Sequence, residues 1–214
     1  MSTWVIVVAA GSGTRFGGAK QFAPLAGRRV LDWSLDAARA HADGVVLVVP
    51  VDRADRAEPG ADVVVVGGAT RSASVRAGLA AVPADATVVV VHDAARPVAS
   101  PELFATVIAA VQDGAVAALP GLAVADTIRH RDGGVVDRDQ LVRVQTPQAF
   151  DGPTLRRAHA DGAEATDDAA LVERLGGTVT VVPGEPANLK ITDADDLAVA
   201  AVLLDRRLAG GRNS

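Results

Sequence analysis

The sequence has no cysteine, and aromatic residues make up only 3% of its 214 positions. The absence of cysteine excludes disulfides, zinc–thiolate sites and cysteine nucleophiles. The scarcity of aromatic side chains argues against a surface that stacks the bases of single-stranded nucleic acid. A formal net charge of -5 argues against non-specific binding to nucleic acid or anionic membrane. We therefore expect a cytoplasmic protein that binds neither nucleic acid nor membrane.

Long hydrophobic runs are also missing. Every apolar stretch is interrupted by Gly, Pro or a charged residue before it reaches the length that spans a membrane. The N-terminal residues MSTWVIVVAAGSG lack the basic segment of a signal peptide. Hydrophobic residues nevertheless make up 49% of the chain, which is enough for one sizeable domain with its own core.

Short runs rich in Val, Ile and Ala recur along the chain and predict β-strands at residues 4–10, 45–50, 62–66, 87–92, 115–120 and 178–183. Because these runs are nearly continuous in apolar residues, they are typical of strands buried on both faces. Helical patterns lie between them, at residues 30–41, 72–82, 101–112 and 193–208, the last with an N-cap at Thr192 or Asp193. This alternation predicts an α/β fold with a Rossmann-like, doubly wound, mostly parallel sheet.

Residues 122–150 interrupt the alternation. Gly133 and Gly134 sit between two alternating runs, which predicts a β-hairpin. Because the segment has little to bury by itself, we interpret it as a protruding arm that packs on a second subunit; a mobile surface hairpin is the alternative. We expect a single domain over residues 1–209 that carries this arm, with residues 210–214 as a disordered tail.

A glycine-rich stretch, AAGSGTRFGGAK, follows the first predicted strand. A dinucleotide-binding fingerprint, G-x-G-x-x-G, fits at Gly11 and Gly13 but has Phe16 in place of the third glycine. Gly13 and Gly18 have the spacing of the two glycines in a P-loop, G-x-x-x-x-G-K-[ST], but Ala19 stands where that motif needs a lysine. The simplest alternative is a tight turn that carries two solvated cations.

A loop that holds a nucleoside triphosphate for attack at its α-phosphate fits the stretch better. Small residues let backbone N–H groups approach phosphate oxygens, and Arg15 and Lys20 place positive charge where charge builds up in the transition state. The sequence offers no obvious general base, because its histidines have neither metal-ligand spacing nor an evident partner: His41, His92, His130 and His159. A phosphate monoester as nucleophile needs none, because its second pKa is about 6.

Further polar motifs lie near the ends of predicted strands. In VHDAARP, Asp93 can hold Mg²⁺ and Arg96 can clamp a phosphate, although a surface Asp–Arg pair is the simpler interpretation. In GGATRSASV, the two glycines would let a nucleotide base approach the backbone closely, and Ser74 could hydrogen-bond that base. An ordinary turn followed by a helix N-cap is the alternative. Lys190 of NLKIT lies in a strand-like segment and needs an anion if it points inward. Thr146 of RVQTPQAF also fits the end of an edge strand.

In this order, the motifs AAGSGTRFGGAKQF, GGATRSASV, VHDAARP, ADT, VDR, TPQAF, TDDA and NLKIT resemble those of the 2-C-methyl-D-erythritol 4-phosphate cytidylyltransferases of the non-mevalonate isoprenoid pathway. The resemblance implies a homodimeric, Mg²⁺-dependent nucleotidyltransferase. It would move CMP from CTP onto 2-C-methyl-D-erythritol 4-phosphate, forming 4-diphosphocytidyl-2-C-methyl-D-erythritol and pyrophosphate. A ribitol 5-phosphate cytidylyltransferase and a non-catalytic, nucleotide-binding regulatory protein are the alternatives.

The resemblance also implies roles for individual residues. The catalytic cations would be Arg15, Lys20 and Lys190. The nucleotide would be held by Ala9, Ala10, Gly11, Gly13, Gly68, Ala69, Ser74 and Asp93, with Asp93 also at the metal and Arg71 nearby. The methylerythritol phosphate would contact Arg96, Thr127, Arg138, Thr146 and Thr166, with Thr127 and Arg138 reaching the partner subunit's site from the arm.

Three positions depart from the family pattern. Ala19 stands where the family usually has Pro, and Ala69 stands where it usually has Asp. Both lie in loops whose backbone is expected to hold the nucleotide. The sequence TDDAA at residues 166–170 replaces the commoner TDEAS, and this change is expected to loosen the contacts to the acceptor or their surroundings.

Overall fold

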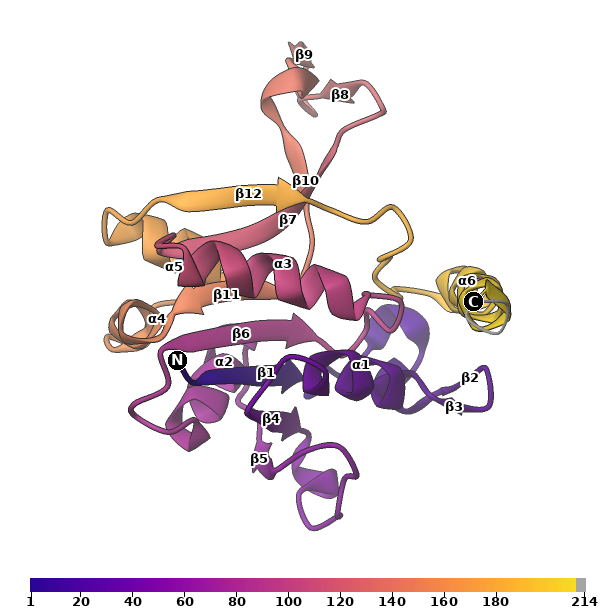
Figure 1. The fold of residues 1–214 in the computed structure, drawn as a ribbon. Coiled ribbons are helices and arrows are strands. Elements are labelled where there is room, and N and C mark those ends of the chain that lie inside the picture. The colour runs from indigo at the N-terminus through magenta and orange to yellow at the C-terminus, as the bar shows by residue number, and fades with distance from the viewer. Residues whose placement is uncertain (211–214) are drawn as a thin grey trace.

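The computed structural model describes residues 1–210, which form a central sheet with helices on both faces (Figure 1). The strands of the sheet are β1 (Thr3–Val8), β4 (Gly44–Val49), β5 (Val63–Val66), β6 (Val88–Asp93), β7 (Ala117–Ala123), β10 (Val142–Val144), β11 (Gln148–Asp151) and β12 (Val179–Pro183). They follow the order β12-β7-β11-β6-β1-β4-β5, and β10 pairs with the end of β7. Only β10 and β11 pair antiparallel with their neighbours in this sheet, so the prediction of a mostly parallel sheet is confirmed.

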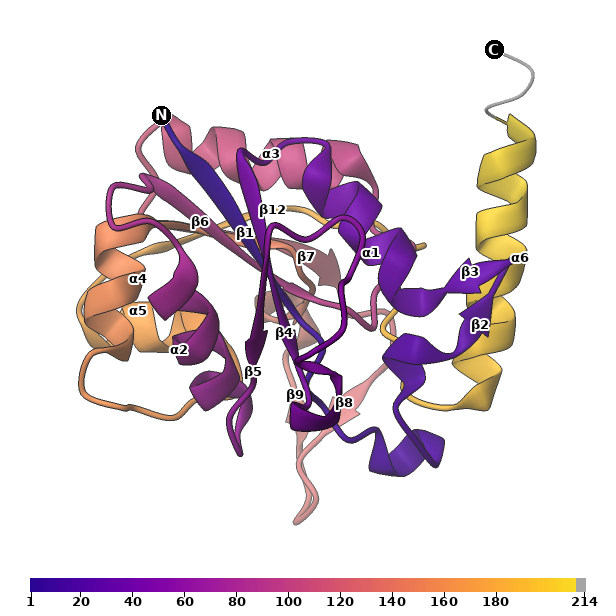
Figure 2. The same cartoon turned by 90° about the horizontal axis from the view of Figure 1, so that it is seen from below.

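Helices cover the two faces of the sheet separately (Figure 2). One face carries α1 (Val30–Arg39) and α3 (Pro101–Gln112). The other face carries α2 (Arg71–Ala81), α4 (Gly152–His159) and α5 (Asp168–Arg174). Each face has its own apolar core, with Phe104 fully buried in the first and Phe150 in the second.

The last helix, α6 (Ala194–Gly210), stands to one side, next to the short strands β2 (Pro24–Leu25) and β3 (Arg28–Arg29). Asp193 caps it, because Asp193 Oδ1 accepts a hydrogen bond from Asp196 N at 3.0 Å, which confirms one of the two predicted caps. The helix includes Gly210 instead of ending before it. Residues 211–214, most of the predicted tail, lie outside the described residues.

The buried strands explain the continuous apolar runs in the sequence. All residues of β4 and β6 are buried, because both strands have neighbours on each side and helices on each face. The same expectation is wrong for β12, most of which is accessible, because it lies at the edge of the sheet and pairs with β7 alone. Among residues 1–210, no helix is both long and apolar enough to cross a membrane.

The predicted arm protrudes from the sheet, and its tip is the hairpin of β8 (Ile128–Arg129) and β9 (Val135–Val136) (Figure 1). Gly133 and Gly134 close this hairpin with φ angles of 111° and 80°, as their position predicts. The boundary at residue 150 is wrong. Residues 148–151 form β11, which lies between β6 and β7, and Phe150 is fully buried beneath them in the core. An apolar run that reads as part of a hairpin belongs to the body of the sheet.

Candidate active site

The glycine-rich loop follows β1 and has a backbone that only glycine allows at one point. Gly13 has a φ of 65°, and a Cβ atom there would lie 1.9 Å from the carbonyl oxygen of Gly18. The buried side chain of Gln21 holds the loop by donating from Nε2 to the carbonyl oxygens of Ala9 and Gly11, at 2.6 and 3.1 Å. Gln21 therefore ties the beginning of the loop to the segment that follows it.

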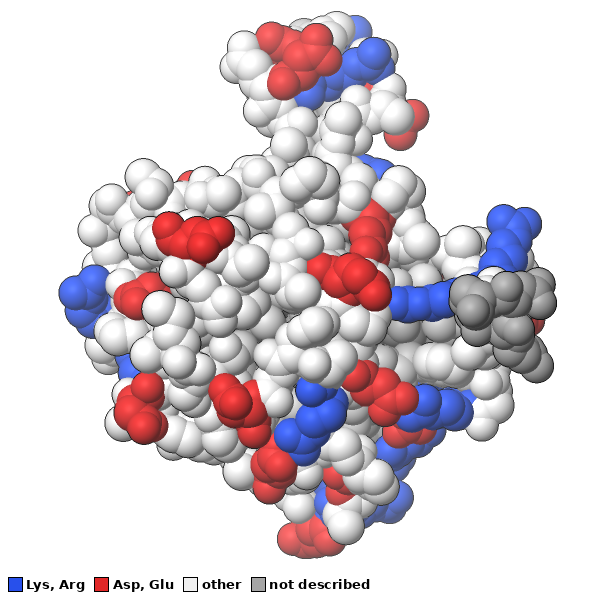
Figure 3. All heavy atoms as spheres, viewed as in Figure 1, with Lys and Arg blue, Asp and Glu red and all other residues white. Residues whose placement is uncertain are grey.

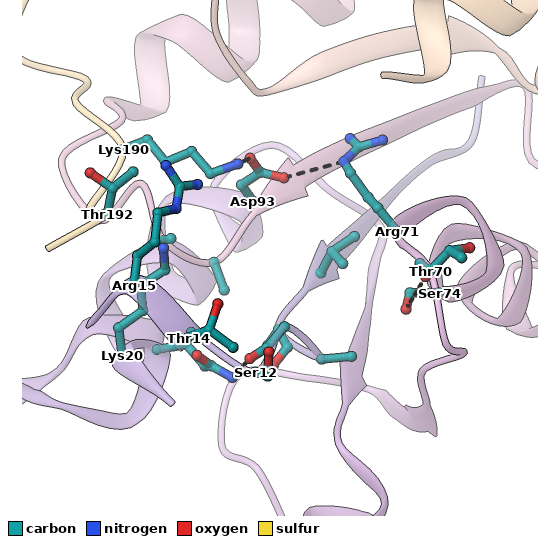
Figure 4. Close-up of a pocket in the computed structure, with 18 of the residues that line it drawn as sticks. Ser12, Thr14, Arg15, Lys20, Thr70, Arg71, Ser74, Asp93, Lys190 and Thr192 are labelled. Carbon is teal, nitrogen blue, oxygen red and sulfur yellow. Dashed lines mark hydrogen bonds and ion pairs between the residues drawn. The ribbon is translucent and has the colours of Figure 1, made fainter. Parts of the chain in front are cut away.

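A cavity of about 460 Å³ opens at the carboxyl end of β1 and β6, where a parallel sheet usually binds its ligand (Figure 4). Its lining includes every predicted nucleotide-binding residue: Ala9, Ala10, Gly11, Gly13, Gly68, Ala69, Ser74 and Asp93. It also includes the predicted catalytic cations Arg15, Lys20 and Lys190. These residues come from segments far apart in the sequence, and the fold brings them together around one space.

The cations gather on one side of the cavity, as Figure 4 shows for Arg15, Lys20 and Lys190. Burial lowers the pKa of Lys20, and the nearby charges of Lys190 and Arg15 lower it further. Such repulsion between like charges is relieved when an anion enters between them. Lys190 lies in a segment without strand pairing, so its predicted strand-like setting is wrong; the segment is fixed by a hydrogen bond from Ile191 N to Ala95 O at 2.8 Å.

Asp93 ends β6 and faces these cations. Its Oδ2 accepts a hydrogen bond from Lys190 Nζ at 2.7 Å, and its Oδ1 lies 3.7 Å from Arg71 Nε. Burial by itself raises the pKa of the Asp93 carboxyl, but the charges of Lys190 and Arg71 outweigh it and hold that pKa well below its usual range. Asp93 therefore stays ionised at neutral pH.

Magnesium fits this site only together with a phosphorylated ligand. Within residues 1–210, no group of His, Cys, Asp and Glu side chains could hold a metal ion by itself. Asp93 is the one acidic side chain among the described residues that line the cavity. One carboxylate plus substrate phosphate oxygens is a usual way for proteins to hold Mg²⁺. The residues present thus suit an ion that arrives with a nucleotide.

None of the predicted acceptor contacts lines this cavity. Thr127 and Arg138 lie on the arm, where Arg138 Nη1 donates to the carbonyl oxygen of Ala125 in the same arm. Arg96 donates to Asn188 O at 2.8 Å, and burial lowers the pKa of its guanidinium. Thr166 is exposed just before α5. Within one copy of the chain, the fold assembles the nucleotide side of the predicted site and leaves the acceptor side dispersed.

Thr146 is the predicted acceptor contact with the least access to solvent, at 5% exposed. Its hydroxyl accepts a hydrogen bond from Asp93 N at 3.1 Å and lies 3.2 Å from His92 Nδ1. Burial lowers the pKa of His92 to about 3, so this ring is neutral, and its Nδ1 shares a hydrogen bond with the Thr146 hydroxyl. Thr146 therefore fixes the backbone of Asp93 from inside the protein.

The sequence shows no evident partner for any histidine, and this expectation is wrong for two of them. His92 contacts Thr146, and His159 Nε2 lies 3.0 Å from Asp168 Oδ1. Asp168 is fully buried and also binds Arg71 at 2.8 Å. No local motif reveals these pairs, because each joins elements that are adjacent only in the folded sheet. Neither histidine lines the cavity.

A doubly wound α/β sheet with a glycine loop, converging cations and a carboxylate at one cavity is typical of a protein that binds a nucleotide. The model of the family described as "IspD: 2-C-methyl-D-erythritol 4-phosphate cytidylyltransferase" matches residues 3–206. The chain belongs to this family. The resemblance predicted from the ordered motifs is thereby confirmed.

Individual relatives agree with this assignment. The chain is 43% identical to the 2-C-methyl-D-erythritol 4-phosphate cytidylyltransferase of Nocardia farcinica, over 97% of this chain and 96% of that protein. It is 44% identical to a bifunctional enzyme IspD/IspF of Nitratidesulfovibrio vulgaris, of whose length it spans 57%. The crystal structure of the 2-C-methyl-D-erythritol 4-phosphate cytidylyltransferase from Thermus thermophilus superposes with a TM-score of 0.84 and a sequence identity of 41%. The match covers 95% of this chain and 98% of that protein's chain.

Proposed function

We propose that this protein transfers CMP from CTP to 2-C-methyl-D-erythritol 4-phosphate. An oxygen of the acceptor phosphate attacks the α-phosphorus of CTP, the bond from that phosphorus to the bridging oxygen breaks, and pyrophosphate leaves with the bonding electrons. The observation that carries the proposal is the convergence of Arg15, Lys20 and Lys190 on a cavity that also contains the nucleotide loops. The glycine-rich loop supplies Arg15 and Lys20, and a segment far along the chain supplies Lys190, so their convergence is a property of the fold.

The chemistry needs cations more than it needs a base. The acceptor phosphate is largely ionised at neutral pH, because its second pKa is about 6, so no side chain has to remove a proton from it. Two anions must instead be held together while negative charge moves onto pyrophosphate. Arg15 and Lys20 would bind the triphosphate and the leaving group. Lys190 would leave Asp93 and approach the α-phosphate.

Asp93 would hold Mg²⁺ through its carboxylate, with phosphate oxygens as the other ligands. When bound, the ion would neutralise charge on the triphosphate and polarise its phosphoryl oxygens. The chain supports Asp93 in two ways. Thr146 fixes its backbone, and Lys190 and Arg71 keep its carboxyl ionised. Gly68 and Ala69 of the loop before α2, together with Ser74 of α2, would receive the cytosine base.

Parallel assays of pyrophosphate release test the proposal. The protein is given CTP and Mg²⁺ with either 2-C-methyl-D-erythritol 4-phosphate or ribitol 5-phosphate as acceptor. We expect release with the methylerythritol phosphate and little with the ribitol phosphate. The reverse preference would identify a ribitol 5-phosphate cytidylyltransferase. CTP binding without release from any acceptor would identify a non-catalytic nucleotide-binding protein.

We further propose that two copies of the chain complete each other's acceptor site. Thr127 and Arg138 lie on the arm that protrudes from the sheet (Figure 1), and neither lines the cavity of its own chain. Charged side chains of both signs gather at the end of the arm, whereas its neck is largely uncharged on the face in view (Figure 3). Near that neck, Val142 and Val144 are 46% and 39% exposed, and Val181 of β12 is 51% exposed. A second copy seated there would cover this apolar surface.

The cytoplasmic location stays a prediction.

Mixing two inactive variants tests this arrangement. Lys20→Ala and Arg138→Ala should each lose most activity, because each lacks one side of every site. After subunit exchange, a mixed dimer has one site with an intact Lys20 and an intact Arg138 from the other chain. An equal mixture should therefore recover about one quarter of wild-type activity if the subunits pair at random. No recovery after exchange, verified by tagged co-purification, would place Arg138 outside the partner's site.

A further inference from the structure

A buried ion-pair network lies behind the cavity, on residues to which the family resemblance assigns no role. Its centre is Asp168, the first residue of α5, whose side chain has no exposed surface. Asp168 Oδ2 accepts a hydrogen bond from Arg71 Nη1 at 2.8 Å. Asp168 Oδ1 accepts one from His159 Nε2, near the end of α4, at 3.0 Å. The network thus joins α2, α4 and α5 on one face of the sheet.

Arg71 carries this network into the cavity. It is the first residue of α2, it lines the cavity, and Figure 4 shows its side chain directed at Asp93. Burial lowers the pKa of Arg71, but the carboxylates of Asp168 and Asp93 more than offset this, so the guanidinium keeps its charge. Arg71 therefore stands between two carboxylates, one inside the protein and one at the site.

The two cations that face Asp93 are held very differently. The Lys190 side chain is 41% exposed, and Asp93 is its one ion-pair partner among residues 1–210. The Arg71 side chain is 24% exposed and is anchored to a carboxylate with 0% exposure. Removing the guanidinium from the buried carboxylate of Asp168 is costly, whereas Lys190 can turn to an incoming phosphate while staying in water. Arg71 is the fixed counter-ion of Asp93, and Lys190 is the exchangeable one.

The bond to Asp168 also sets the distance between the Arg71 guanidinium and the Asp93 carboxylate. At 3.7 Å from Oδ1, Arg71 Nε stabilises the charge of Asp93 without making a hydrogen bond of ordinary length. The lone pairs of Oδ1 thereby stay available to another ligand. A guanidinium released from Asp168 would be free to close on Asp93 as a direct, charge-assisted pair and would occupy them.

We propose that Asp168, oriented by His159, is a positioning residue that holds Arg71 back from Asp93 and so keeps the Asp93 carboxylate available to Mg²⁺-CTP. The inference rests on the proposed function of the cavity. It concerns one of the departures from the family pattern, since Asp168 stands where the commoner motif has Glu. In this chain the shorter carboxylate is bonded on both oxygens, so the structure gives no sign of loosening at this residue.

Other contacts also attach α2 to the segment before α5. An effect of Asp168 on the position of Arg71 can therefore be distinguished from a general loss of contact between these two segments. Ser72 Oγ donates to Ala165 O and accepts from Ala165 N, both at 3.2 Å. Arg76 pairs with Glu164 at 2.7 Å. These contacts do not involve Arg71, and we expect them to persist when Asp168 loses its charge. Arg76→Gln is therefore a matched control that breaks an ion pair between the same two segments and leaves the network intact.

Calorimetric titration of CTP, with Mg²⁺ and separately with EDTA, tests the proposal. Asp168→Asn should weaken binding of Mg²⁺-CTP about tenfold, as loss of a residue that orients a metal ligand typically does. Binding of CTP in EDTA should change by less than about twofold, because the phosphate-binding cations are untouched. Arg76→Gln should leave both affinities unchanged. Equal weakening with and without metal, or no weakening, would overturn the proposal.

Two further comparisons keep the test decisive if Asp168→Asn folds poorly. His159→Gln keeps an N–H donor for Asp168 and should bind Mg²⁺-CTP like the wild type, whereas His159→Leu should bind it more weakly. If Asp168 acts through Arg71, adding Asp168→Asn to Arg71→Gln should cause no additional loss; additive losses contradict the proposal. Failure of the proposed function shows separately, as wild-type protein that binds Mg²⁺-CTP and transfers CMP to no acceptor.

Discussion

Replacing Lys20 by alanine is expected to reduce turnover by roughly a hundredfold to a thousandfold, the loss that follows removal of one preorganised donor from a transition state. Lys20 lies with Arg15 and Lys190 on one side of the cavity, and their mutual repulsion lowers its pKa in addition to the effect of burial. An entering triphosphate turns that repulsion into attraction. Pyrophosphate release at saturating CTP and acceptor measures the loss, and calorimetry measures CTP binding separately.

Arg206→Gln is the control for charge. Arg206 is exposed on α6, so the substitution also removes one positive charge but should leave turnover unchanged. Near-normal turnover of Lys20→Ala at saturating substrates would contradict the role given to Lys20. A loss confined to CTP affinity would make Lys20 a binding residue that does not act in the chemical step.

The pH dependence follows from the direction of the Lys20 pKa. Because burial and then the charges of Lys190 and Arg15 lower this pKa from the ordinary 10.5, rising pH removes the cation earlier than it would from an exposed lysine. The ratio kcat/KM reports the free enzyme, so it should fall on the alkaline side with a midpoint below 10.5. Lys20→Arg should remove this alkaline limb, because a guanidinium stays charged there.

The sequence predicts those parts of the fold in which local pattern and tertiary context agree. The runs that became β4 and β6 are continuous in apolar residues because both strands are buried on both faces. The helix at residues 101–112 is predicted to the residue, and in the structure Ser100 caps its start by accepting a hydrogen bond from Leu103 N. The prediction failed at β11 because there the local pattern and the tertiary context disagree. Residues 148–151 follow an arm without a turn of their own, and only pairing with β6 and β7 places them in the sheet.

The same distinction applies to the candidate site: some of its residues lie in local motifs, and others are brought together only by the fold. The residues predicted to hold the nucleotide lie in recognisable motifs, and Arg15, Ser74 and Asp93 all line one cavity. Residues that support them do not, because the pairing of Asp168 with Arg71 spans 97 positions of the chain. Thr146 illustrates a third case. Its motif is recognisable, but its hydroxyl is turned to Asp93 N inside the protein, which the sequence pattern does not show.

Replacing Asp93 by asparagine is expected to reduce turnover on the order of a thousandfold, because the amide loses the charge that would bind Mg²⁺. The fold should survive the change. Arg71 keeps Asp168 as its partner, and Lys190 is 41% exposed and keeps most of its hydration, so we expect a stability loss of about 1 kcal/mol. Urea unfolding checks the stability, and pyrophosphate release over a series of Mg²⁺ concentrations checks the activity.

The comparison of Asp93→Asn with Lys20→Ala separates a metal ligand from a phosphate-binding cation. Loss of the Asp93 charge makes the cavity more positive, so CTP in EDTA should bind at least as tightly as it does to the wild type, while Mg²⁺-CTP binds more weakly. Lys20→Ala should weaken both. Asp85→Asn, at an exposed position outside the cavity, controls for the loss of a carboxylate and should change neither. If Asp93→Asn weakened CTP binding equally with and without metal, its carboxylate would serve to orient Lys190 and Arg71, and the metal would have to be held by phosphate oxygens without help from Asp93.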